Sequence, residues 1–320
     1  MADLNKQFQV YKSNISVSDS KETSLRTSRD NIRETIKDYF SVELSIAKPK
    51  FWQQGSFSFR TMIKPMEAEI DVDDGVYLQH LPMDKSDWPK TNEIRQLLLD
   101  AVKNITYSMP EDKSNCVRVI YKNDYHIDLP IYAETKGAYY LSTYSKSEGW
   151  IPSDPKAFKD WFYNKKKILG TQLQPCIKYL KAWGDFVSCD LTGIMYTILS
   201  AEHLHAKEDR DDICLVKTVE NIVNHLTFIR SIKRPVTPFE NLIDDWSKSK
   251  LDRVISQLER LKDKGNNALN ESNDEKANEI WQSLLGDRFP NHDSNTEQFS
   301  KSNAPNVILV KESAPKPWRQ

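Results

Sequence analysis

Residues 68–79, AEIDVDDGVYLQ, restrict the possible structures of this chain more than any other segment. Residues two apart point to the same face of a β-strand, so Asp71 and Asp73 project together while Ile70 and Val72 face the core. Two neighbouring carboxylates on a packed strand repel each other unless a cation lies between them. Hard divalent cations, above all Mg²⁺, prefer such oxygen ligands and often share their coordination shell with substrate phosphates. The segment therefore predicts a metal-binding strand.

A third carboxylate comes from a second apolar segment, HIDLP, in which Asp128 stands between Ile127 and Leu129. A charge within such a strand needs a partner. If this strand lies beside the first, Asp128 completes a site for two metal ions about 3.5–4 Å apart, which stabilise both oxygens of an in-line displacement. Upstream, Gly55 would let the backbone approach a triphosphate, and the Ser56 hydroxyl would donate to a phosphate oxygen.

Each of these features also has a simpler interpretation on its own. An Asp-x-Asp pair often lies on the solvated face of a strand, and a Gly-Ser pair alone indicates almost nothing. Asp128 could equally be a strand-end carboxylate that caps a turn. Their order, their spacing and their apolar neighbours together favour the metal site. Asp74 directly follows Asp73, but strand alternation turns its side chain to the other face. We therefore do not expect Asp74 to belong to the metal site.

The first half of the chain has strand character and the second half has helical periodicity. In the first half, one helix follows Ser28 and another covers 91–104. The remaining segments alternate apolar with polar residues or are rich in β-branched and aromatic types, and we expect strands over 50–59, 68–79, 116–121, 125–133 and 137–144. Asp154-Pro155 is a typical helix start. Periodicity then predicts helices over 154–168, 171–186, 191–206, 212–230, 238–262 and 274–285.

This pattern predicts an α+β protein with two lobes and a cleft between them. We expect an α/β lobe over residues 1–153, built from a mixed sheet flanked by helices, and a helical lobe over 154–290. Residues 291–320 are polar or proline-rich and lack periodicity, so we expect them to be flexible or extended.

The composition favours small-molecule chemistry over binding of a nucleic-acid polymer or a membrane. Lys and Arg number 45 against 46 Asp and Glu, whereas proteins that hold long nucleic acids usually show a basic excess. The four cysteines lack the spacing of a zinc site or a disulfide framework, so we expect reduced thiols. The N-terminal segment does not resemble a signal peptide, and no run reaches the roughly 18–20 apolar residues of a membrane span. We therefore expect a soluble cytoplasmic protein.

At these residues the chain resembles the nucleotidyltransferase superfamily typified by DNA polymerase beta. It is more similar still to the bacterial cGAS/DncV-like nucleotidyltransferases, or CD-NTases, the signal-producing enzymes of CBASS anti-phage defence. The long stretch between Ser56 and Asp71 is shared with the DncV-like branch. The segments that carry the resemblance span nearly the whole chain: QGSFSFRT (54–61), EIDVDDGVYL (69–78), HIDLPIY (126–132), WIPSDP (150–155), IKYLKAW (177–183) and LLGDRFP (284–290).

The resemblance implies that Asp71, Asp73 and Asp128 are catalytic and bind two Mg²⁺ ions, for which Mn²⁺ could substitute. It also implies a set of side chains and backbone groups that contact the nucleotide substrate: Gln54, Gly55, Ser56, Lys178, Lys181 and Thr192. The two lysines could instead be ordinary surface residues, and the threonine could be a helix N-cap.

The implied reaction joins ribonucleoside triphosphates into a cyclic dinucleotide, or a trinucleotide, with release of pyrophosphate. The product would act as a second messenger for a cyclic-nucleotide-sensing effector in anti-phage signalling. The chain lacks a Cys/His zinc insertion like that of animal cGAS, so we do not expect direct activation by DNA or an obligate nucleic-acid partner. Two rival functions remain: another template-independent nucleotidyltransferase activity, such as RNA tailing or modification of a small acceptor, and a non-catalytic nucleotide-binding scaffold.

Two further groups of residues attract attention. His203 and His205 are two apart on a predicted helix and therefore point to different sides, which argues against a shared metal. Tyr144 and Trp150 are candidates for stacking on a nucleobase, although most aromatic side chains in such positions belong to a core.

Overall fold

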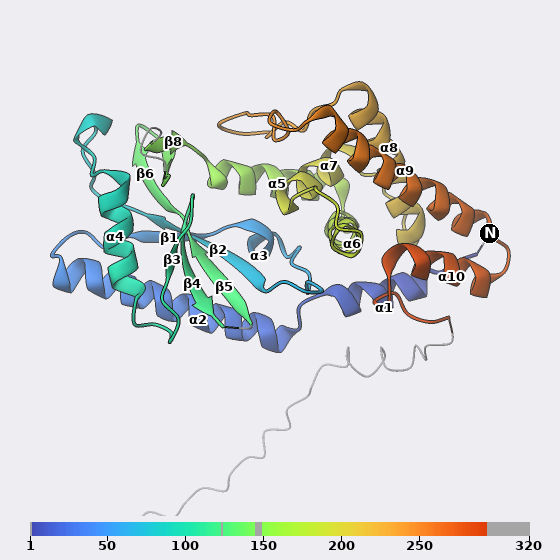
Figure 1. The fold of residues 1–320 in the computed structure, drawn as a ribbon, viewed down its shortest axis with the longest axis horizontal. Helices are drawn as coiled ribbons and strands as arrows, with labels where there is room; N and C mark the ends of the chain where they lie inside the picture. The colour runs from blue at the N-terminus through green and yellow to red at the C-terminus, as the bar shows by residue number, and fades with distance from the viewer. Residues whose placement is uncertain (1, 123, 145–148, 293–320) are drawn as a thin grey trace, which may run out of the picture.

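A mixed β-sheet carries the acidic residues, and a lobe of helices lies beside it (Figure 1). The computed structural model describes residues 2–122, 124–144 and 149–292. The sheet runs in the order β3-β4-β5-β2-β6-β7-β8, with β1 paired to β2. Its strands are β1 (Lys50–Gln53), β2 (Ile70–Tyr77), β3 (Glu111–Asp112), β4 (Val117–Tyr121), β5 (Tyr125–Leu129), β6 (Ile131–Thr135), β7 (Ala138–Ser142) and β8 (Trp150–Pro152). The predicted α+β class is confirmed.

The centre of the sheet is formed by β4, β5 and β2. β2 and β5 run parallel, and their register places Asp73 directly opposite Asp128. β4 runs antiparallel to β5 and places Arg118 opposite Asp128 on its other side. Residues opposite each other on neighbouring strands lie on the same face of a sheet. These three side chains therefore form one polar row across three strands.

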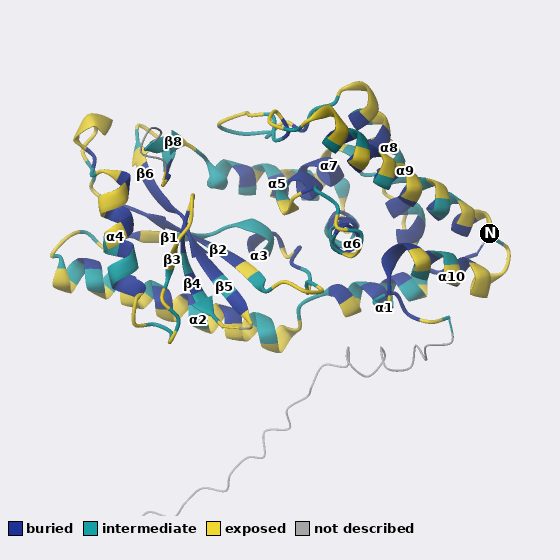
Figure 2. Ribbon diagram, in the orientation of Figure 1, coloured by how far each residue is buried: buried dark blue, intermediate teal, exposed yellow. Residues whose placement is uncertain are grey.

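The other face of the sheet is apolar and is covered by α2 (Asp19–Asp38) and α4 (Thr91–Val102). Val72 and Ile127, which alternate with the acids, belong to the same buried cluster as Ile32 of α2 and Leu98 of α4. Figure 2 shows this arrangement as buried residues along the central strands and exposed residues along the outer side of α2. Two short helical segments, η1 (Tyr39–Glu43) and η2 (Lys85–Asp87), complete this part.

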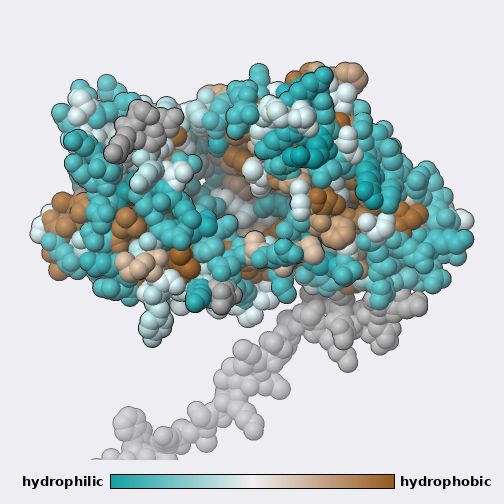
Figure 3. Space-filling model, viewed as in Figure 1, coloured by the Kyte–Doolittle hydropathy of each residue, from teal (hydrophilic) through white to brown (hydrophobic). Residues whose placement is uncertain are grey.

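The helical lobe has its own apolar core. Asp154 caps its first helix, as predicted, by accepting a hydrogen bond from the Ala157 N–H at 2.9 Å. The helices are α5 (Pro155–Leu169), α6 (Leu173–Phe186), α7 (Gly193–His203), α8 (Asp211–Phe228), α9 (Lys248–Asn270) and α10 (Asp274–Leu285). No helix among the described residues is both long enough and apolar enough to span a membrane. Most of the face seen in Figure 3 is hydrophilic, as the high content of charged residues leads one to expect.

Four predicted elements differ from the structure. The helix expected to follow Ser28 begins at Asp19, where the Ser18 hydroxyl caps it by accepting a hydrogen bond from the Lys21 N–H at 3.3 Å. The strand expected over 50–59 ends at Gln53, and Gly55–Phe59 forms the short helix α3, because Gly55 has a φ of +59° and turns the chain out of the strand. The strand expected over 125–133 is divided at Pro130, which lacks an N–H for the ladder. The helix expected over 238–262 begins at Lys248, because the preceding segment folds back on itself through a bridge between Lys233 and Asn241.

The helix α1 (Asn5–Ile15) was not predicted, and it changes the expected boundary of the first lobe. Its buried side chains belong to the core of the helical lobe, where the ring of Phe8 lies 5.4 Å from Tyr179, 4.9 Å from Trp281 and 5.3 Å from Phe289. The assignment of residues 1–153 to the α/β lobe is therefore wrong for α1. The prediction for residues 291–320 concerns a segment of which 293–320 lie outside the described residues.

We expect Phe8→Ala to destabilise the protein by about 3–5 kcal/mol, because it removes a buried ring that joins α1 to the helical core. Urea unfolding followed by tryptophan fluorescence measures this loss. Phe228→Ala is the control, since Phe228 is 81% exposed and its truncation should change the free energy of unfolding by no more than about 0.5 kcal/mol. Equal losses in the two variants would show that α1 is not part of the core.

Candidate active site

The three predicted acids lie together on the polar face of the sheet. Asp128 is 9% exposed, whereas the side chain of Asp71, at the open end of the row, is 56% exposed. Burial, followed by the charges of Asp128 and Asp71, raises the pKa of Asp73 to about 7. Lys181 and Arg118 act in the opposite direction on the same pKa. The carboxylates thus lie close enough to oppose one another's ionisation, and the site favours a cation.

Arg118 supplies such a cation in this structure. Its Nε and Nη2 donate to the two carboxylate oxygens of Asp128 at 2.7 and 2.8 Å, and Nη2 lies 3.2 Å from Asp71 Oδ1. Sequence reasoning missed Arg118, although the signal was present. Tyr121 pairs with Tyr125 at the end of the hairpin formed by β4 and β5. Three residues back along β4 and three residues forward along β5, the same register places Arg118 opposite Asp128.

Gly55 lets the first turn of α3 press against Asp73. Its φ of +59° is in the left-handed region that favours glycine, and a Cβ at this position would lie only 2.0 Å from Asp73 Oδ2. The Gln54 N–H also donates to the Asp73 carbonyl oxygen at 3.0 Å. Ser56, the next residue, is therefore presented beside the acids. The Gly-Ser pair and the Asp-x-Asp pair are therefore joined directly, because only a glycine at position 55 allows α3 to lie against Asp73.

The side-chain amide of Gln54 is held by two tyrosines. Gln54 Nε2 donates to the Tyr77 hydroxyl at 3.1 Å, and the Tyr132 hydroxyl donates to Gln54 Oε1 at 3.2 Å. The two tyrosine rings stack with their centroids 4.8 Å apart. Gln54 contributes to the site, but its amide is already engaged in fixing the position of the neighbouring strands.

A cleft of about 440 Å³ opens between the acids and the helical lobe. Its acidic wall comes from the sheet, and three cations, Lys159, Lys181 and Arg234, line it from the helical lobe. A cavity of this size is in the range of pockets that hold small molecules. The lining residues are Gln54, Gly55, Ser56, Phe59, Asp71, Asp73, Asp128, Tyr132, Ser153, Pro155, Phe158, Lys159, Lys181, Gly193, Ile194, Thr197 and Arg234.

Only one of the two predicted lysines reaches the cleft. Lys181 lines it and donates to the Thr61 carbonyl oxygen at 3.2 Å, while burial lowers the pKa of its ammonium to about 8. Lys178 instead donates to the Ser16 hydroxyl at 2.9 Å and is not among the described lining residues. Residues three apart on a helix are neighbours but do not point in the same direction. Thr192 occupies the N-cap of α7, and the next residue, Gly193, lines the cleft in its place.

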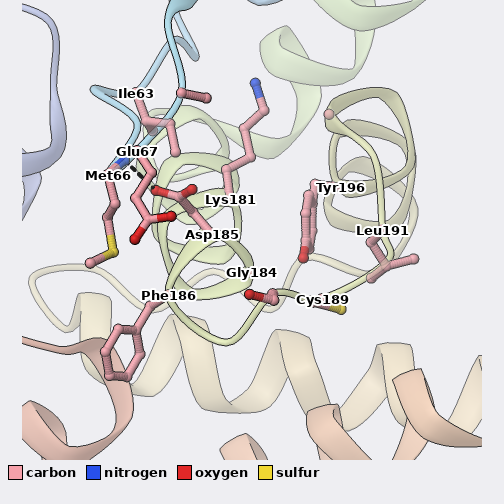
Figure 4. A pocket seen from close by; sticks show the side chains of 13 residues that line it. Ile63, Met66, Glu67, Lys181, Gly184, Asp185, Phe186, Cys189, Leu191 and Tyr196 are labelled. Atoms are coloured by element: carbon pink, nitrogen blue, oxygen red, sulfur yellow. Dashed lines mark hydrogen bonds between the residues drawn. The ribbon is translucent and has the colours of Figure 1, made fainter.

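The stretch between α3 and β2 docks on the helical lobe. The Met66 N–H donates to Asp185 Oδ2 at 3.0 Å, as Figure 4 shows, and Arg288 Nη1 donates to the Lys64 carbonyl oxygen at 2.9 Å. The Lys64 N–H in turn donates to the Ile15 carbonyl oxygen at 2.7 Å. The long spacing between Ser56 and Asp71 therefore serves to join the two lobes beside the cleft.

A second cavity, of about 520 Å³, lies behind Lys181. It shares Lys181 and Gly193 with the cleft. In Figure 4 the ammonium end of Lys181 points away from Asp185 and Tyr196, so this side chain contributes its aliphatic stem to the second cavity. We assign the charge of Lys181 to the cleft.

The other tempting residues have structural partners. His203 is the last residue of α7, and its ring lies 4.5 Å from that of His225, while His205 follows the helix. The Trp150 Nε1–H donates to the Pro89 carbonyl oxygen at 3.0 Å. Tyr144 is exposed, and neither Tyr144 nor Trp150 is among the described residues that line the cleft.

Asp74 confirms the alternation argument that excluded it. Its side chain is buried on the other face of the sheet, where Arg33 of α2 donates from Nε and Nη2 to its two oxygens at 2.7 and 2.5 Å. This pair joins α2 to the sheet and has no part in the cleft.

The carboxylates of Asp71, Asp73 and Asp128 are suitable ligands for a hard divalent cation, but their side chains are not oriented to bind one together in this structure. No group of three His, Cys, Asp or Glu side chains among the described residues could hold a metal ion as they stand. Asp128 and Asp71 instead contact the guanidinium of Arg118, whose positive charge takes the place of a metal ion. The carboxylate oxygens are nonetheless the ligands that Mg²⁺ prefers, and the raised pKa of Asp73 reflects acids that a metal ion would neutralise.

Comparison with known proteins points to one group. Residues 49–132 match the family model described as the nucleotidyltransferase domain of cyclic GMP-AMP synthase DncV-like proteins. A cyclic GMP-AMP synthase of Escherichia albertii is 29% identical over 64% of this chain and 47% of its own length. A cyclic AMP-AMP-AMP synthase of an Acinetobacter species is 25% identical over 90% of this chain and 87% of its own length. The chain thus spans about half the length of the first of these relatives and most of the second.

Solved structures show the same fold. The structure of Vibrio cholerae DncV with nonhydrolyzable GTP superposes with a TM-score of 0.78 at 19% identity and covers 91% of this chain and 98% of its own. The complex of the same protein with the linear intermediate 5′ pppA(3′,5′)pG gives a TM-score of 0.77 at 19% identity over 93% of this chain and 99% of its own. The expectation of a nucleotidyltransferase lobe joined to a helical lobe is confirmed at the level of fold.

We expect Gly55→Ala to disturb the site much more than Gly137→Ala. Both glycines have a positive φ, so both variants carry backbone strain of about 1 kcal/mol. Only at Gly55 does the new Cβ meet Asp73, whereas nothing lies within 4 Å of the Cβ at Gly137. Titration with Mn²⁺, followed by electron paramagnetic resonance, should show weaker binding for Gly55→Ala alone. Equal Mn²⁺ affinity in the two variants would contradict this account of Gly55.

We expect Arg118→Met to destabilise the metal-free protein by up to about 3 kcal/mol, because Asp128 loses its ion pair in a largely buried position. Added Mg²⁺ should recover more stability in this variant than in the wild type, since it replaces the missing cation. Thermal unfolding in EDTA and in excess Mg²⁺ measures both effects. Arg253→Met is the control, because its pair with Asp190 lies at the surface and should contribute about 1 kcal/mol or less. An equal Mg²⁺ effect on wild type and Arg118→Met would exclude this role.

Proposed function

We propose that this chain is a DncV-like nucleotidyltransferase, or CD-NTase, and that it joins ribonucleoside triphosphates into a cyclic dinucleotide with release of pyrophosphate. The observation that carries the proposal is the in-register placement of Asp73 and Asp128 beside Asp71, across a cleft from Lys181. A cyclic trinucleotide is the second form of product, since one relative is named for a product of three adenosine units.

The chain's own groups supply the positioning that phosphoryl transfer requires. Oxygens of Asp71, Asp73 and Asp128 would hold two divalent cations, which when bound favour loss of the proton from the attacking hydroxyl and neutralise the leaving pyrophosphate. Gly55 brings the backbone of α3 against Asp73 and places Ser56 beside the donor phosphates. Lys181, which is half-buried, faces them from the helical lobe, where reduced contact with water makes its charge more effective than at a surface.

The product would serve as a second messenger in anti-phage signalling and would be read by an effector that senses cyclic nucleotides. The relatives' names support this reading of the chemistry, because they describe synthases of cyclic GMP-AMP, cyclic AMP-AMP-AMP and c-di-GMP. We also propose a cytoplasmic location, where ribonucleoside triphosphates are available as substrates. Mg²⁺ is the proposed metal, with Mn²⁺ as a substitute of similar ligand preference.

We expect Asp71→Asn combined with Asp73→Asn to lower turnover at least about a thousandfold, which corresponds to roughly 4 kcal/mol of transition-state stabilisation. Purified protein is incubated with labelled ribonucleoside triphosphates and Mg²⁺, and the phosphatase-resistant product is separated by chromatography. Asp100→Asn in α4 is the control, because Asp100 is remote from the cleft lining and pairs only with its helix neighbours.

The same assay separates the rival functions. Products that remain sensitive to phosphatase, or that grow on an added RNA or small acceptor, would replace cyclisation by another nucleotidyltransferase activity. A wild-type protein that binds nucleotides without turning them over would be a scaffold. Full activity of the double Asn variant would remove the basis of the site assignment.

A further inference from the structure

Three cations from different elements of the helical lobe line the cleft. Lys181 of α6 lies beside Gly193 at the start of α7, where an added Cβ would be 3.2 Å from Lys181 Cε. Lys159 of α5 and Arg234, from the segment between α8 and α9, line the same cleft from other elements. Figure 1 shows that the segment between α8 and α9 reaches over α5 toward the α/β lobe. The proposed function assigns Lys181 to the donor phosphates but gives no role to Lys159 and Arg234.

Arg234 is fixed in place by its own segment. Its backbone N–H donates to the Glu240 carbonyl oxygen at 2.8 Å, and its Nε and Nη2 donate to Glu240 Oε1 at 2.9 and 2.7 Å. The Asp154 N–H donates to the Thr237 carbonyl oxygen at 3.4 Å, which fastens this segment to the start of α5. Glu240 thus engages one edge of the guanidinium and leaves Nη1 available on a pre-positioned side chain.

Lys159 is a half-buried cation with no partner among the residues that the structure describes. It stands one turn into α5, next to the buried Phe158, and has no hydrogen bond or ion pair with any residue that the structure describes. A lysine in such a position usually has an acidic partner or full access to water. Two cations that line one cleft, one restrained and one unpaired, fit an anionic ligand with several oxygens.

We infer that Lys159 and Arg234 form a subsite for the intact 5′-triphosphate of the acceptor nucleotide. This inference rests on the proposed function, in which two ribonucleoside triphosphates react. A ribose hydroxyl oxygen of the acceptor bonds to the α-phosphorus of the donor, the bond from that phosphorus to pyrophosphate breaks, and the hydroxyl proton leaves to solvent. The acceptor triphosphate is not cleaved in this step, so its charge must be accommodated apart from the donor's.

A phosphate ligand accounts for both cations better than a nucleobase does. An arginine alone can read the O6 and N7 acceptors of guanine. A second cation that lacks a fixed fork geometry adds little to recognition of a neutral base edge, but it adds directly to the binding of a polyanion. The two interpretations differ in the feature of the acceptor that matters: its phosphates or its base.

A reaction that forms a single linear product tests the subsite. The donor is a 2′,3′-dideoxynucleoside triphosphate, which cannot act as acceptor. The acceptor is offered either as an α,β-methylene triphosphate or as a monophosphate of the same nucleoside, neither of which can act as donor. We expect the double variant Lys159→Gln, Arg234→Gln to raise KM for the triphosphate acceptor at least about tenfold and to leave KM for the monophosphate acceptor and for the donor unchanged.

The matched controls are Lys167→Gln, on the same helix, and Lys233→Gln, next to Arg234, which remove exposed lysines that are not among the described lining residues. Lys159→Arg should retain most of the affinity for the triphosphate acceptor. An equal rise in KM for the monophosphate acceptor, a rise in KM for the donor, or an effect that follows guanine rather than the phosphates would overturn the subsite.

Equilibrium binding separates this inference from the proposed function. With Ca²⁺ and the α,β-methylene triphosphate as probe, calorimetry should give two bound nucleotides for the wild type and one for the double variant. Two sites without any dinucleotide product would reject the proposed function and leave the subsite in place. Dinucleotide formation with an unchanged acceptor KM in the double variant, or a single site in the wild type, would reject the subsite.

Discussion

Repulsion between Asp73 and Asp128 is the interaction on which the arrangement of the site depends. The parallel register of β2 and β5 places these carboxylates directly opposite each other, and Asp71 adds a third charge one step along the same face. An apolar core on the other side of the strands fixes that register, since a slip of one residue would bury the acids and expose Val72 and Ile127. The fold therefore holds like charges together and makes a compensating cation necessary.

The cations come from two sources with different consequences. Arg118 belongs to the sheet itself, so the acids are neutralised in part even without a ligand. Lys159, Lys181 and Arg234 belong to the helical lobe and compensate the acids, or a ligand's phosphates, only when the two lobes are correctly placed. The nucleotide chemistry proposed for this cleft would thus depend on the placement of the lobes as much as on the residues of the sheet.

The parts of the site that sequence reasoning could find are those encoded by local periodicity. Asp71 and Asp73 follow from the two-residue period of a strand, and Arg118 was accessible from the hairpin register, although it was missed. The alternating aromatics Phe57 and Phe59 imitated a strand, because the reversal at Gly55 depends on the contact with Asp73. Lys181 was reached only through family resemblance. Lys159 and Arg234 could not be found, since their place in one cleft depends on how a distant segment packs against the start of α5.

The placement of the lobes is determined at several points around the cleft. The chain passes from α1 in the helical core to α2 on the sheet, and a bridge between Ser16 and Ile63 ties this crossing to the stretch after α3. The chain passes between the lobes a second time where β8 leads into α5. There the Lys156 ammonium lies 3.4 Å from the ring centroid of Trp52 and 4.3 Å from that of Tyr139. These cation–π contacts attach the first turn of α5 to the sheet. Since Lys159 lies three residues further along the same helix and lines the cleft, the position of this cation relative to the acids depends on how that first turn of α5 is attached to the sheet.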